Sequence, residues 1–295
     1  MNLKELIFLK DLACKAALAA GEVIKSADRE VAVEIKDGGS TRASQVVTEV
    51  DFKAQQAILE VIEPTLPKHN LGLLSEEQVD DCSRFEKEYF WAIDPLDGTL
   101  AFLEGKDGFA VSISLIGRDG IPRLGVVYDP VNDRLLEAIK DNGASCNKEP
   151  LLLPRAVSMQ CHFIIDKSTK VLLQETKVKE QITQKLKEQG LSLVEEYTHY
   201  GAVMNICKAL EYSNACFFKL PKAQRGSGCI WDYGAMACIY TEAGGLVTDC
   251  FAQPLSLNSP DTVFMNRCGV VFASREELIE VLCRTLTESI SSFQI

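Results

Sequence analysis

Residues 91–99, WAIDPLDGT, form the stretch from which the rest of the chain can be interpreted. An apolar segment leads directly into two carboxylates, Asp94 and Asp97, which stand three residues apart. Pro95 biases the preceding backbone towards an extended conformation, so both acids are held stiffly at a strand end. Gly98 permits a tight turn, and a short helix can follow whose free N–H groups point back towards the acids. This arrangement is suited to a cation bound beside a phosphate.

The same residues have an ordinary alternative, since Asp, Pro and Gly also form simple turns after strands. A second string favours the functional interpretation: WDYGA at residues 231–235 continues to EAGG at residues 242–245. In this order, the two strings resemble the signatures of the inositol monophosphatase-like superfamily of magnesium-dependent, lithium-sensitive phosphatases. The resemblance implies an α/β protein with the five-layered αβαβα sandwich of the sugar-phosphatase type.

The composition is that of an ordinary globular protein, with 46% hydrophobic and 25% charged residues in a chain of 295. A formal charge of -11 argues against a general electrostatic surface for long nucleic acids. An acidic protein that handles a phosphate must reverse its own local field, and divalent cations held by carboxylates would do this. No run approaches the length of a membrane span, which predicts a soluble, cytoplasmic protein with no membrane partner.

The cysteines and histidines point away from a disulfide framework and a zinc site. There are 11 cysteines, an odd number, with no Cys-x-x-Cys pair, and the 3 histidines are dispersed. Many cysteines stand beside apolar residues, so we expect buried, reduced thiols.

The chain is predicted to consist of two packed halves. Residues 1–154 should form an α+β half, with antiparallel strands separated by Gly/Asp/Pro turns. Beyond about residue 154 strands and helices alternate, which predicts an α/β half over residues 155–295. In the first half we predict helices over 2–24 and 52–62 and strands over 31–36, 110–116, 123–128 and 134–140. In the second half we predict strands over 161–165, 192–196, 215–220, 246–248 and 269–273, and helices over 171–188, 202–211, 232–242 and 275–286.

Four acids are the candidate metal ligands. Convergent carboxylates repel one another, so such a cluster needs cations, and oxygen-only ligation favours a hard ion such as Mg²⁺. The resemblance implies that Glu76, Asp94 and the backbone carbonyl of Leu96 hold one Mg²⁺. It further implies that Asp94, Asp97 and Asp232 hold a second, with a third, more weakly held ion near Glu76.

Two of the candidate residues have ordinary alternatives. Glu76 and Glu77 could be a solvated surface pair, and Asp51 could simply open the helix that follows it. The resemblance instead assigns Glu76 to a metal. It matches Asp51 to the acid of a Val-Thr-x-x-Asp element behind the metal site, which helps to orient water.

The resemblance also implies a mechanism, in which a metal-activated water attacks a phosphate monoester in line without a covalent phosphoenzyme. Thr99 would orient that water together with Glu76 and Asp51, and the amides of Gly98 and Thr99 would bind the phosphate. Inhibition by Li⁺ is expected on the same grounds. The Gly-rich loop at residues 104–108 is either a hairpin connection or a mobile flap over the substrate.

Arg225 is the candidate specificity residue. Inositol enzymes of the superfamily usually carry an acid seven positions before the C-terminal aspartate, where this chain has Arg225. Arg225 ends a basic stretch that begins at Lys219. Arginine and lysine suit a second phosphate or another anion on the substrate, although a solvated loop is the alternative. We therefore predict a 3'(2'),5'-bisphosphate nucleotidase that converts 3'-phosphoadenosine 5'-phosphate to AMP. The alternatives are an inositol-1-phosphatase or related sugar monophosphatase, and a catalytically idle, metal-responsive regulatory or binding subunit. A homodimer is left open.

Overall fold

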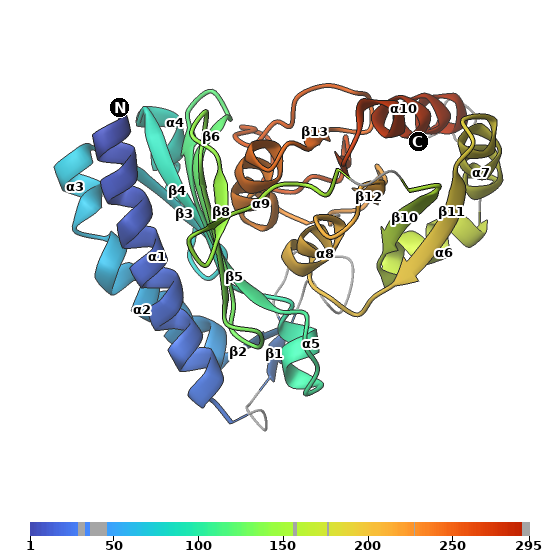
Figure 1. Ribbon diagram of the computed structural model, residues 1–295. Helices are drawn as coiled ribbons and strands as arrows, with labels where there is room; N and C mark the ends of the chain where they lie inside the picture. The colour runs from blue at the N-terminus through green and yellow to red at the C-terminus, as the bar shows by residue number, and fades with distance from the viewer. Residues whose placement is uncertain (29–32, 36–45, 156–157, 176, 227, 291–295) are drawn as a thin grey trace.

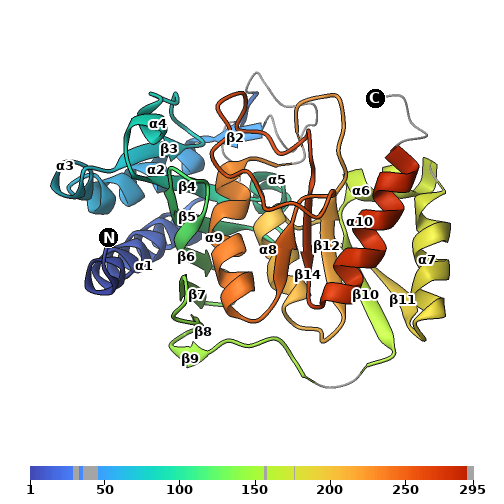
Figure 2. The same cartoon turned by 90° about the horizontal axis from the view of Figure 1, so that it is seen from above.

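The computed structural model describes residues 1–28, 33–35, 46–155, 158–175, 177–226 and 228–290. Within these ranges, helices and sheets alternate as five layers: outer helices, a first sheet, middle helices, a second sheet and a second set of outer helices (Figures 1 and 2). The predicted mixed α/β fold class is confirmed. None of the described helices combines the length and the apolar character that a membrane span requires.

The first sheet has seven strands, and all of its neighbouring pairs are antiparallel except one. Its first two strands are parallel, because a connection containing a short helix separates them in the chain. The three strands predicted between residues 110 and 140 are confirmed as successive hairpins. In spatial order the strands are β3 (Gly72–Ser75), β4 (Tyr89–Asp97), β5 (Ala110–Gly117), β6 (Pro122–Asp129), β7 (Arg134–Ile139), β8 (Ala144–Cys146) and β9 (Glu149–Pro150).

Two long helices, α1 (Leu3–Ser26) and α2 (Glu49–Ile62), cover the outer face of this sheet (Figure 1). At Gly21 an added Cβ would lie 2.1 Å from the ring of Tyr128, so the helix backbone approaches β6 closely. The remaining short elements of this half are β1 (Val33–Ile35) and β2 (Val46–Thr48), which pair antiparallel, and α3 (Thr65–His69), α4 (Ser83–Glu86) and α5 (Thr99–Leu103). The ends of the strand predicted over 31–36 lie outside the described residues.

The second sheet has five strands, and the carboxyl ends of three of them lie together. Strand β10 (Gln160–Ile165) is parallel to both of its neighbours, β11 (Ser192–Tyr197) and β12 (Ala215–Lys219). Strand β14 (Val270–Ala273) is antiparallel to β12 and to the edge strand β13 (Leu246–Thr248). The carboxyl ends of β10, β11 and β12 therefore meet at one edge of the sheet.

Helices α6 (Lys167–Glu175), α7 (Val178–Glu188) and α10 (Glu276–Ile290) cover the outer face of the second sheet (Figure 2). The single helix predicted over 171–188 is wrong, because two helices occupy this region. Asp166 accepts a hydrogen bond from the backbone N–H of Thr169 at 2.8 Å and so starts α6 earlier than predicted. A separate helix, α7, then buries Val178 and Ile182 at helical spacing.

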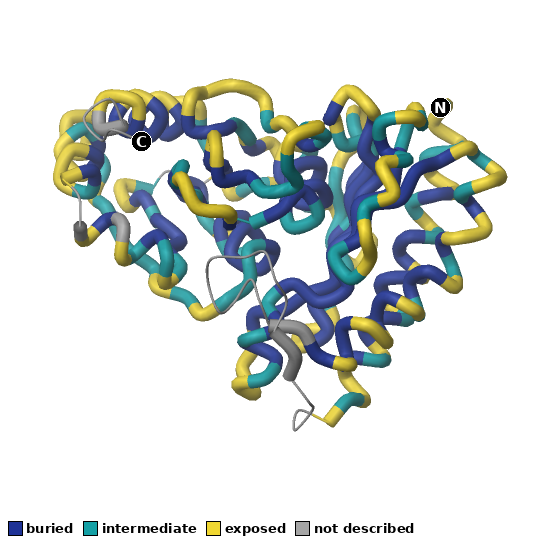
Figure 3. Tube along the Cα trace, turned by 180° about the vertical axis from the view of Figure 1, so that it is seen from behind, coloured by how far each residue is buried: buried dark blue, intermediate teal, exposed yellow. Residues whose placement is uncertain are grey.

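Two helices, α8 (Ala202–Ala209) and α9 (Ile230–Glu242), form the layer between the sheets. Glycines at the contact allow α9 to approach the first sheet closely, because they have no side chain. An added Cβ at Gly234 would lie 2.4 Å from Ser114 Oγ, and one at Gly125 would lie 2.3 Å from the carbonyl oxygen of Ala235. The buried chain segments accordingly concentrate in the inner layers, as Figure 3 shows. This close approach brings the start of α9 to the acids of β4.

Candidate metal centre

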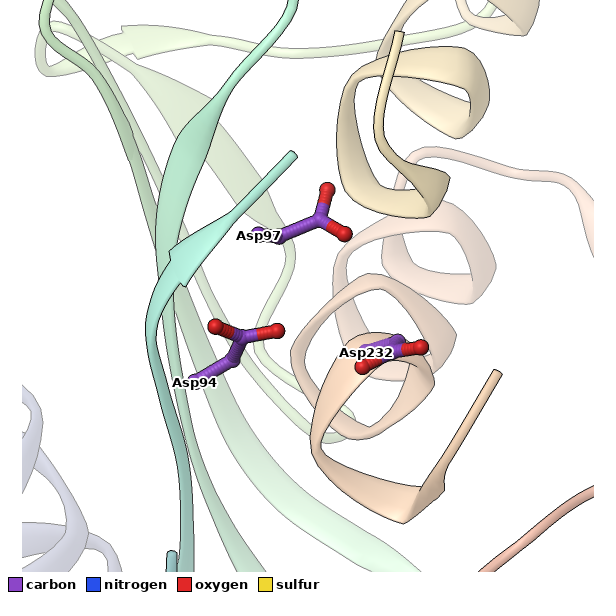
Figure 4. A group of neighbouring side chains, drawn as sticks. All are labelled: Asp94, Asp97 and Asp232. Carbon is purple, nitrogen blue, oxygen red and sulfur yellow. The ribbon is translucent and has the colours of Figure 1, made fainter. Parts of the chain in front are cut away.

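Three carboxylates from two layers converge at the junction of the first sheet and the middle helices. Asp94 and Asp97 come from β4 and Asp232 from α9 (Figure 4), and one oxygen of each lies within 4.8 Å of the others. All three were predicted as ligands from the sequence.

Strand geometry alone would not bring Asp94 and Asp97 together, because residues three apart point to opposite faces of a regular strand. Phe90 packs in the core shared with the middle helices, whereas Trp91 packs in the core under α1 and α2. Asp94 continues the face of Phe90. The pairing of β4 with β5 shifts between Asp94 and Asp97, and this irregularity, at Pro95, turns the second acid towards the middle layer as well.

Asp97 is held by the second half of the chain. Its two carboxylate oxygens accept hydrogen bonds from the backbone N–H groups of Ala202, at 3.1 Å, and Val203, at 2.9 Å, at the start of α8. Gly201 leaves room for this contact, since an added Cβ there would lie 2.2 Å from an Asp97 oxygen. Sequence reasoning missed this support because Gly201 is distant in the chain from Asp97 and belongs to neither signature.

Asp232 and Glu76 complete the acid cluster from opposite sides. Asp232 belongs to the first turn of α9, where its carboxylate accepts from the backbone N–H of Cys229 at 3.0 Å. Glu76 follows β3, and its N–H donates to the carbonyl of Ile93 at 3.1 Å. Its side chain is hydrogen-bonded to Asp94. The turn after β3 is fixed by Gln55, which donates to the carbonyl of Glu77 at 3.1 Å and was not predicted.

A hydrogen-bonded chain runs behind the acids. Thr99 Oγ1 lies 3.0 Å from Asp51 Oδ1 and 3.1 Å from the carbonyl oxygen of Leu96. The other carboxylate oxygen of Asp51 accepts from the backbone N–H of Thr48 at 2.8 Å and from its hydroxyl at 2.6 Å. Helix α2 therefore begins at Glu49 with Thr48 as its N-cap, and Asp51 is the capping-box partner inside the first turn, so the ordinary interpretation, in which Asp51 opens a helix at residue 52, is wrong. Asp51 also contacts Thr99, as its functional interpretation requires.

The acids raise one another's pKa values. Burial raises the pKa of Asp94 well above its usual range, and Glu76, Asp232 and Asp97 add to the effect. Burial likewise raises the pKa of Asp97 to about 7, although the N–H groups of α8 favour its ionised form. The pKa of Asp232 is also raised well above normal, by burial and then by Asp97 and Glu76. Ionising these carboxylates together requires cations, and a cluster with only oxygen donors fits Mg²⁺.

Gly98, which the sequence predicts to bind phosphate, adopts φ 86° and precedes α5. An added Cβ there would lie 2.7 Å from the carbonyl oxygen of Gly108, so the strained conformation and the lack of space both require glycine. The loop at residues 104–108 joins α5 to β5. Asp107 in this loop accepts hydrogen bonds from Tyr200, at 3.0 Å, and pairs with His199 Nε2 at 2.9 Å, so the loop connects the two halves.

The two basic residues near the site differ in their placement. Arg225 is exposed, and its guanidinium carbon lies 6.0 Å from the ring centre of Phe264. Lys219, at the end of β12, is largely buried, and Asp232 and Asp97 both act on its pKa. The sequence analysis included both residues in one basic stretch, 219–225, and singled out Arg225 because of its spacing from Asp232.

Comparisons with known proteins agree with the signatures. The sequence profile described as "Inositol monophosphatase family" matches residues 6–291. An inositol-1-monophosphatase from Synechocystis is 29% identical over 293 residues, covering 96% of this chain and 90% of the relative. The Nus factor SuhB of Haemophilus influenzae is 28% identical, covering 86% and 89%. Among solved structures, an IMPase from Thermotoga maritima superimposes with a TM-score of 0.71 at 23% identity, covering 94% of this chain and 98% of that one.

Proposed function

Because the chain belongs to the inositol monophosphatase family of phosphoric monoester hydrolases, we propose that it is an Mg²⁺-dependent phosphatase of a small, anionic phosphate monoester. The observation that carries this proposal is the cluster of carboxylates, with Asp94 and Asp97 buried, Asp232 half-buried and all three pKa values raised, beside the hydrogen-bonded Thr99 and Asp51. In this proposal the metal ligands are the side chains of Glu76, Asp94, Asp97 and Asp232 and the carbonyl of Leu96.

Bound Mg²⁺ would supply a lowered pKa for the attacking water and positive charge for the phosphoryl oxygens. The chain itself would position the reactants. The Thr99 hydroxyl, held 3.0 Å from Asp51, can orient a water molecule in front of the cluster, with Glu76 on its other side. Burial raises the pKa of Asp51, while its bonds to Thr48 and Thr99 favour the carboxylate. Asp51 would thus act as the acceptor that fixes the orientation of Thr99.

The phosphate would bind where β4 meets α5. The φ of 86° at Gly98 leads the chain from β4 into α5, and in this proposal the free amides of the first turn would bind the phosphate. Asp97 joins this side to α8, which belongs to the second half. A substrate bound there would have its phosphate against the first half and its leaving group against the second.

For the substrate, we propose 3'-phosphoadenosine 5'-phosphate first. Lys219 ends β12, and Lys222 and Arg225 follow it before α9. Residues 219–225 contain no acid, although Asp166, from the segment after β10, pairs with Lys219. This charge supports a substrate with a second anionic group. Inositol 1-phosphate is the second candidate, because the relative from Synechocystis is named an inositol-1-monophosphatase. A binding role without catalysis is the third, because another relative is named a Nus factor.

The test is phosphate release by the purified protein from 3'-phosphoadenosine 5'-phosphate and from inositol 1-phosphate. Chelation should stop turnover and added Mg²⁺ should restore it. Li⁺ should inhibit in the presence of Mg²⁺, whereas Na⁺ or K⁺ at equal ionic strength should inhibit much less, which separates a specific effect from charge screening. No turnover of either ester, or of a panel of small phosphate monoesters, would favour the binding role.

A further inference from the structure

The loop between α5 and β5 is held at its far end by the second half of the chain. Both carboxylate oxygens of Asp107 are occupied: one pairs with His199 Nε2 at 2.9 Å, and the other accepts from the Tyr200 hydroxyl at 3.0 Å. The carbonyl of the next residue, Gly108, accepts a further bond from the N–H of Gly201 at 2.8 Å. Three hydrogen bonds therefore join this loop to the segment that leads into α8.

Three glycines that are far apart in the chain meet at this junction. An added Cβ at Gly98 would lie 2.7 Å from the carbonyl oxygen of Gly108, and one at Gly108 would lie 2.1 Å from the ring of Tyr200. The same Gly108 carbonyl is the acceptor for the N–H of Gly201. The turn before α5 and the residue before α8 thus lie against one peptide group, so a shift of the loop would change the distance between them.

The start of α8 also supports one of the proposed metal ligands. Ala202 and Val203 donate their N–H groups to the carboxylate of Asp97 at 3.1 and 2.9 Å. The first amides of a helix have no acceptor within the helix, so Asp97 supplies the acceptor that these two need. A movement of the start of α8 would therefore change the orientation of Asp97.

Asp107 binds a segment that is itself anchored on α8. Partial burial raises the pKa of Asp107, but the hydrogen bonds from His199 and Tyr200 outweigh this effect and bring the pKa below its usual value. The rings of His199 and Tyr200 also pack edge to face, with their centres 5.0 Å apart. The buried side chain of Asn205, on α8, donates to the carbonyl of Tyr200 at 3.0 Å. A pull on either partner of Asp107 is thus transmitted to α8.

We propose that Asp107 is a positioning residue, which holds the start of α8 against the turn before α5 and thereby orients Asp97 for a bound cation. The inference rests on the proposed phosphatase function only where it concerns the cation. In this role Asp107 acts through α8 and contacts neither the cation nor the substrate. Of the two interpretations of residues 104–108 from the sequence, a mobile flap and a fixed connection, it selects the fixed connection.

Amide hydrogen exchange in the metal-free protein tests the positioning directly. In Asp107→Ala, the N–H groups of Ala202 and Val203 should exchange roughly tenfold faster than in wild type, because their protection depends on contact with Asp97. The N–H of Gly201 should follow them, because its acceptor lies on the released loop. The amides at the centre of β5 should keep their exchange rates within about twofold, which excludes a general loss of stability.

The matched control is Asp119→Ala. The two aspartates have similar exposure, 48% for Asp119 and 46% for Asp107, and each pairs with a basic side chain. The partner of Asp119 is Arg123, however, and both belong to the hairpin of β5 and β6, so this pair does not join the two halves. Asp119→Ala should leave the exchange of the α8 amides as in wild type.

Two further variants separate the hydrogen bonds of Asp107 from its charge. The amide of Asp107→Asn can accept from Tyr200 and donate to the unprotonated nitrogen of a neutral His199, so most of the protection of the α8 amides should return. Tyr200→Phe removes one of the two bonds and should accelerate exchange by about threefold. It also serves as the second variant if Asp107→Ala does not fold.

The metal requirement gives a second measurement. In Asp107→Ala, the Mg²⁺ concentration for half-maximal turnover should rise about three- to tenfold, whereas kcat at saturating Mg²⁺ should stay within about threefold of wild type. Equal exchange of the α8 amides in wild type and in folded Asp107→Ala would overturn the proposal, as would a loss of kcat with an unchanged metal requirement. A wild type that hydrolyses none of the esters but shows the expected exchange would refute the proposed function and leave the positioning of Asp97 by Asp107 supported.

Discussion

The two sides of the site are built in different ways. The acids of β4, Asp94 and Asp97, lie within one short stretch, and a chain irregularity at Pro95 turns Asp97 to the face that Asp94 already occupies. The facing edge of the second sheet is assembled from residues far apart in the chain, since Asp166 and Lys219 are 53 positions apart. In the proposed function, the first region would carry the chemistry that any phosphate monoester needs, whereas the second would contact the part of the substrate that distinguishes one ester from another.

This difference predicts how each side responds to substitution. Substitutions of the β4 acids should reduce turnover of all substrates alike, because they change the contacts that hold the cations and the reacting phosphate. Changes at the edge of the second sheet should affect substrates selectively.

Asp94→Asn should cause the largest loss. Asp94 contacts Glu76 and lies among the acids that raise its pKa, so the substitution removes a carboxylate that both proposed cations share. Turnover should fall roughly a thousandfold or more on every substrate. Because one repulsive charge is removed, the metal-free protein should be at least as stable as wild type in urea unfolding.

The matched control is Asp129→Asn, which also alters a buried aspartate of the first sheet. Asp129 pairs with Arg134 at 3.1 Å and fixes the turn after β6, far from any role in catalysis. This variant should lose stability, on the order of 1–3 kcal/mol, and keep most of its kcat. Activity of Asp94→Asn within a few-fold of wild type would remove Asp94 from the metal centre.

Much of the first region could be predicted from the sequence, since two contiguous signatures contain Asp94, Asp97 and Asp232. The strands and helices followed from apolar periodicity and turn residues. The division of 171–188 into two helices was missed, because the cap at Asp166 precedes the apolar pattern. The support of Asp97 by α8 and the position of Lys219 depend on which strand ends share an edge, and this is a property of the sheet order rather than of any local sequence.

Gly201→Ala tests whether α8, in the second half of the chain, positions the carboxylate of Asp97 in the first half. A Cβ at this position would lie 2.2 Å from an Asp97 oxygen, so the carboxylate must move away from the N–H groups of α8. A displacement of about 1 Å typically costs about a hundredfold in rate, and we expect a loss on the order of ten- to hundredfold on all substrates. The Mg²⁺ concentration needed for half-maximal activity should rise as well. An unchanged rate and metal requirement would mean that the contact with α8 has no part in positioning Asp97.

The pH dependence of stability tests the repulsion among the acids. The pKa of Asp97 is raised from its usual value to about 7, so the folded state holds a proton that the unfolded state releases. The metal-free protein should therefore lose stability as pH rises between about 4 and 7, with the loss complete above the folded pKa. Urea unfolding in chelator should give a free energy on the order of 1–3 kcal/mol lower at pH 7.5 than at pH 5.5.

Mg²⁺ should reverse this loss at pH 7.5, because cations compensate the carboxylates. Asp97→Asn should flatten the pH dependence in chelator. A metal-free protein that becomes more stable over the same interval would show that the acids of β4 are compensated by the chain itself, and the case for a divalent centre would weaken.

Arg225→Glu should have the smallest effect, and it compares the two basic residues directly. The side chain of Arg225 is exposed and rests over Phe264 at 6.0 Å, so any attraction that it offers a bound anion is screened by water and salt. We expect at most about a threefold loss of kcat/KM for 3'-phosphoadenosine 5'-phosphate, which shrinks further as salt is added, and no loss for inositol 1-phosphate. Lys219, buried and held by Asp166, lacks that screening, so its removal should cost more and depend less on salt. If Arg225→Glu proved the more damaging and the more selective of the two, the residue indicated by the sequence would be the one that binds the second anionic group, and the segment that carries it would have to approach the substrate more closely than its exposed position in the structure.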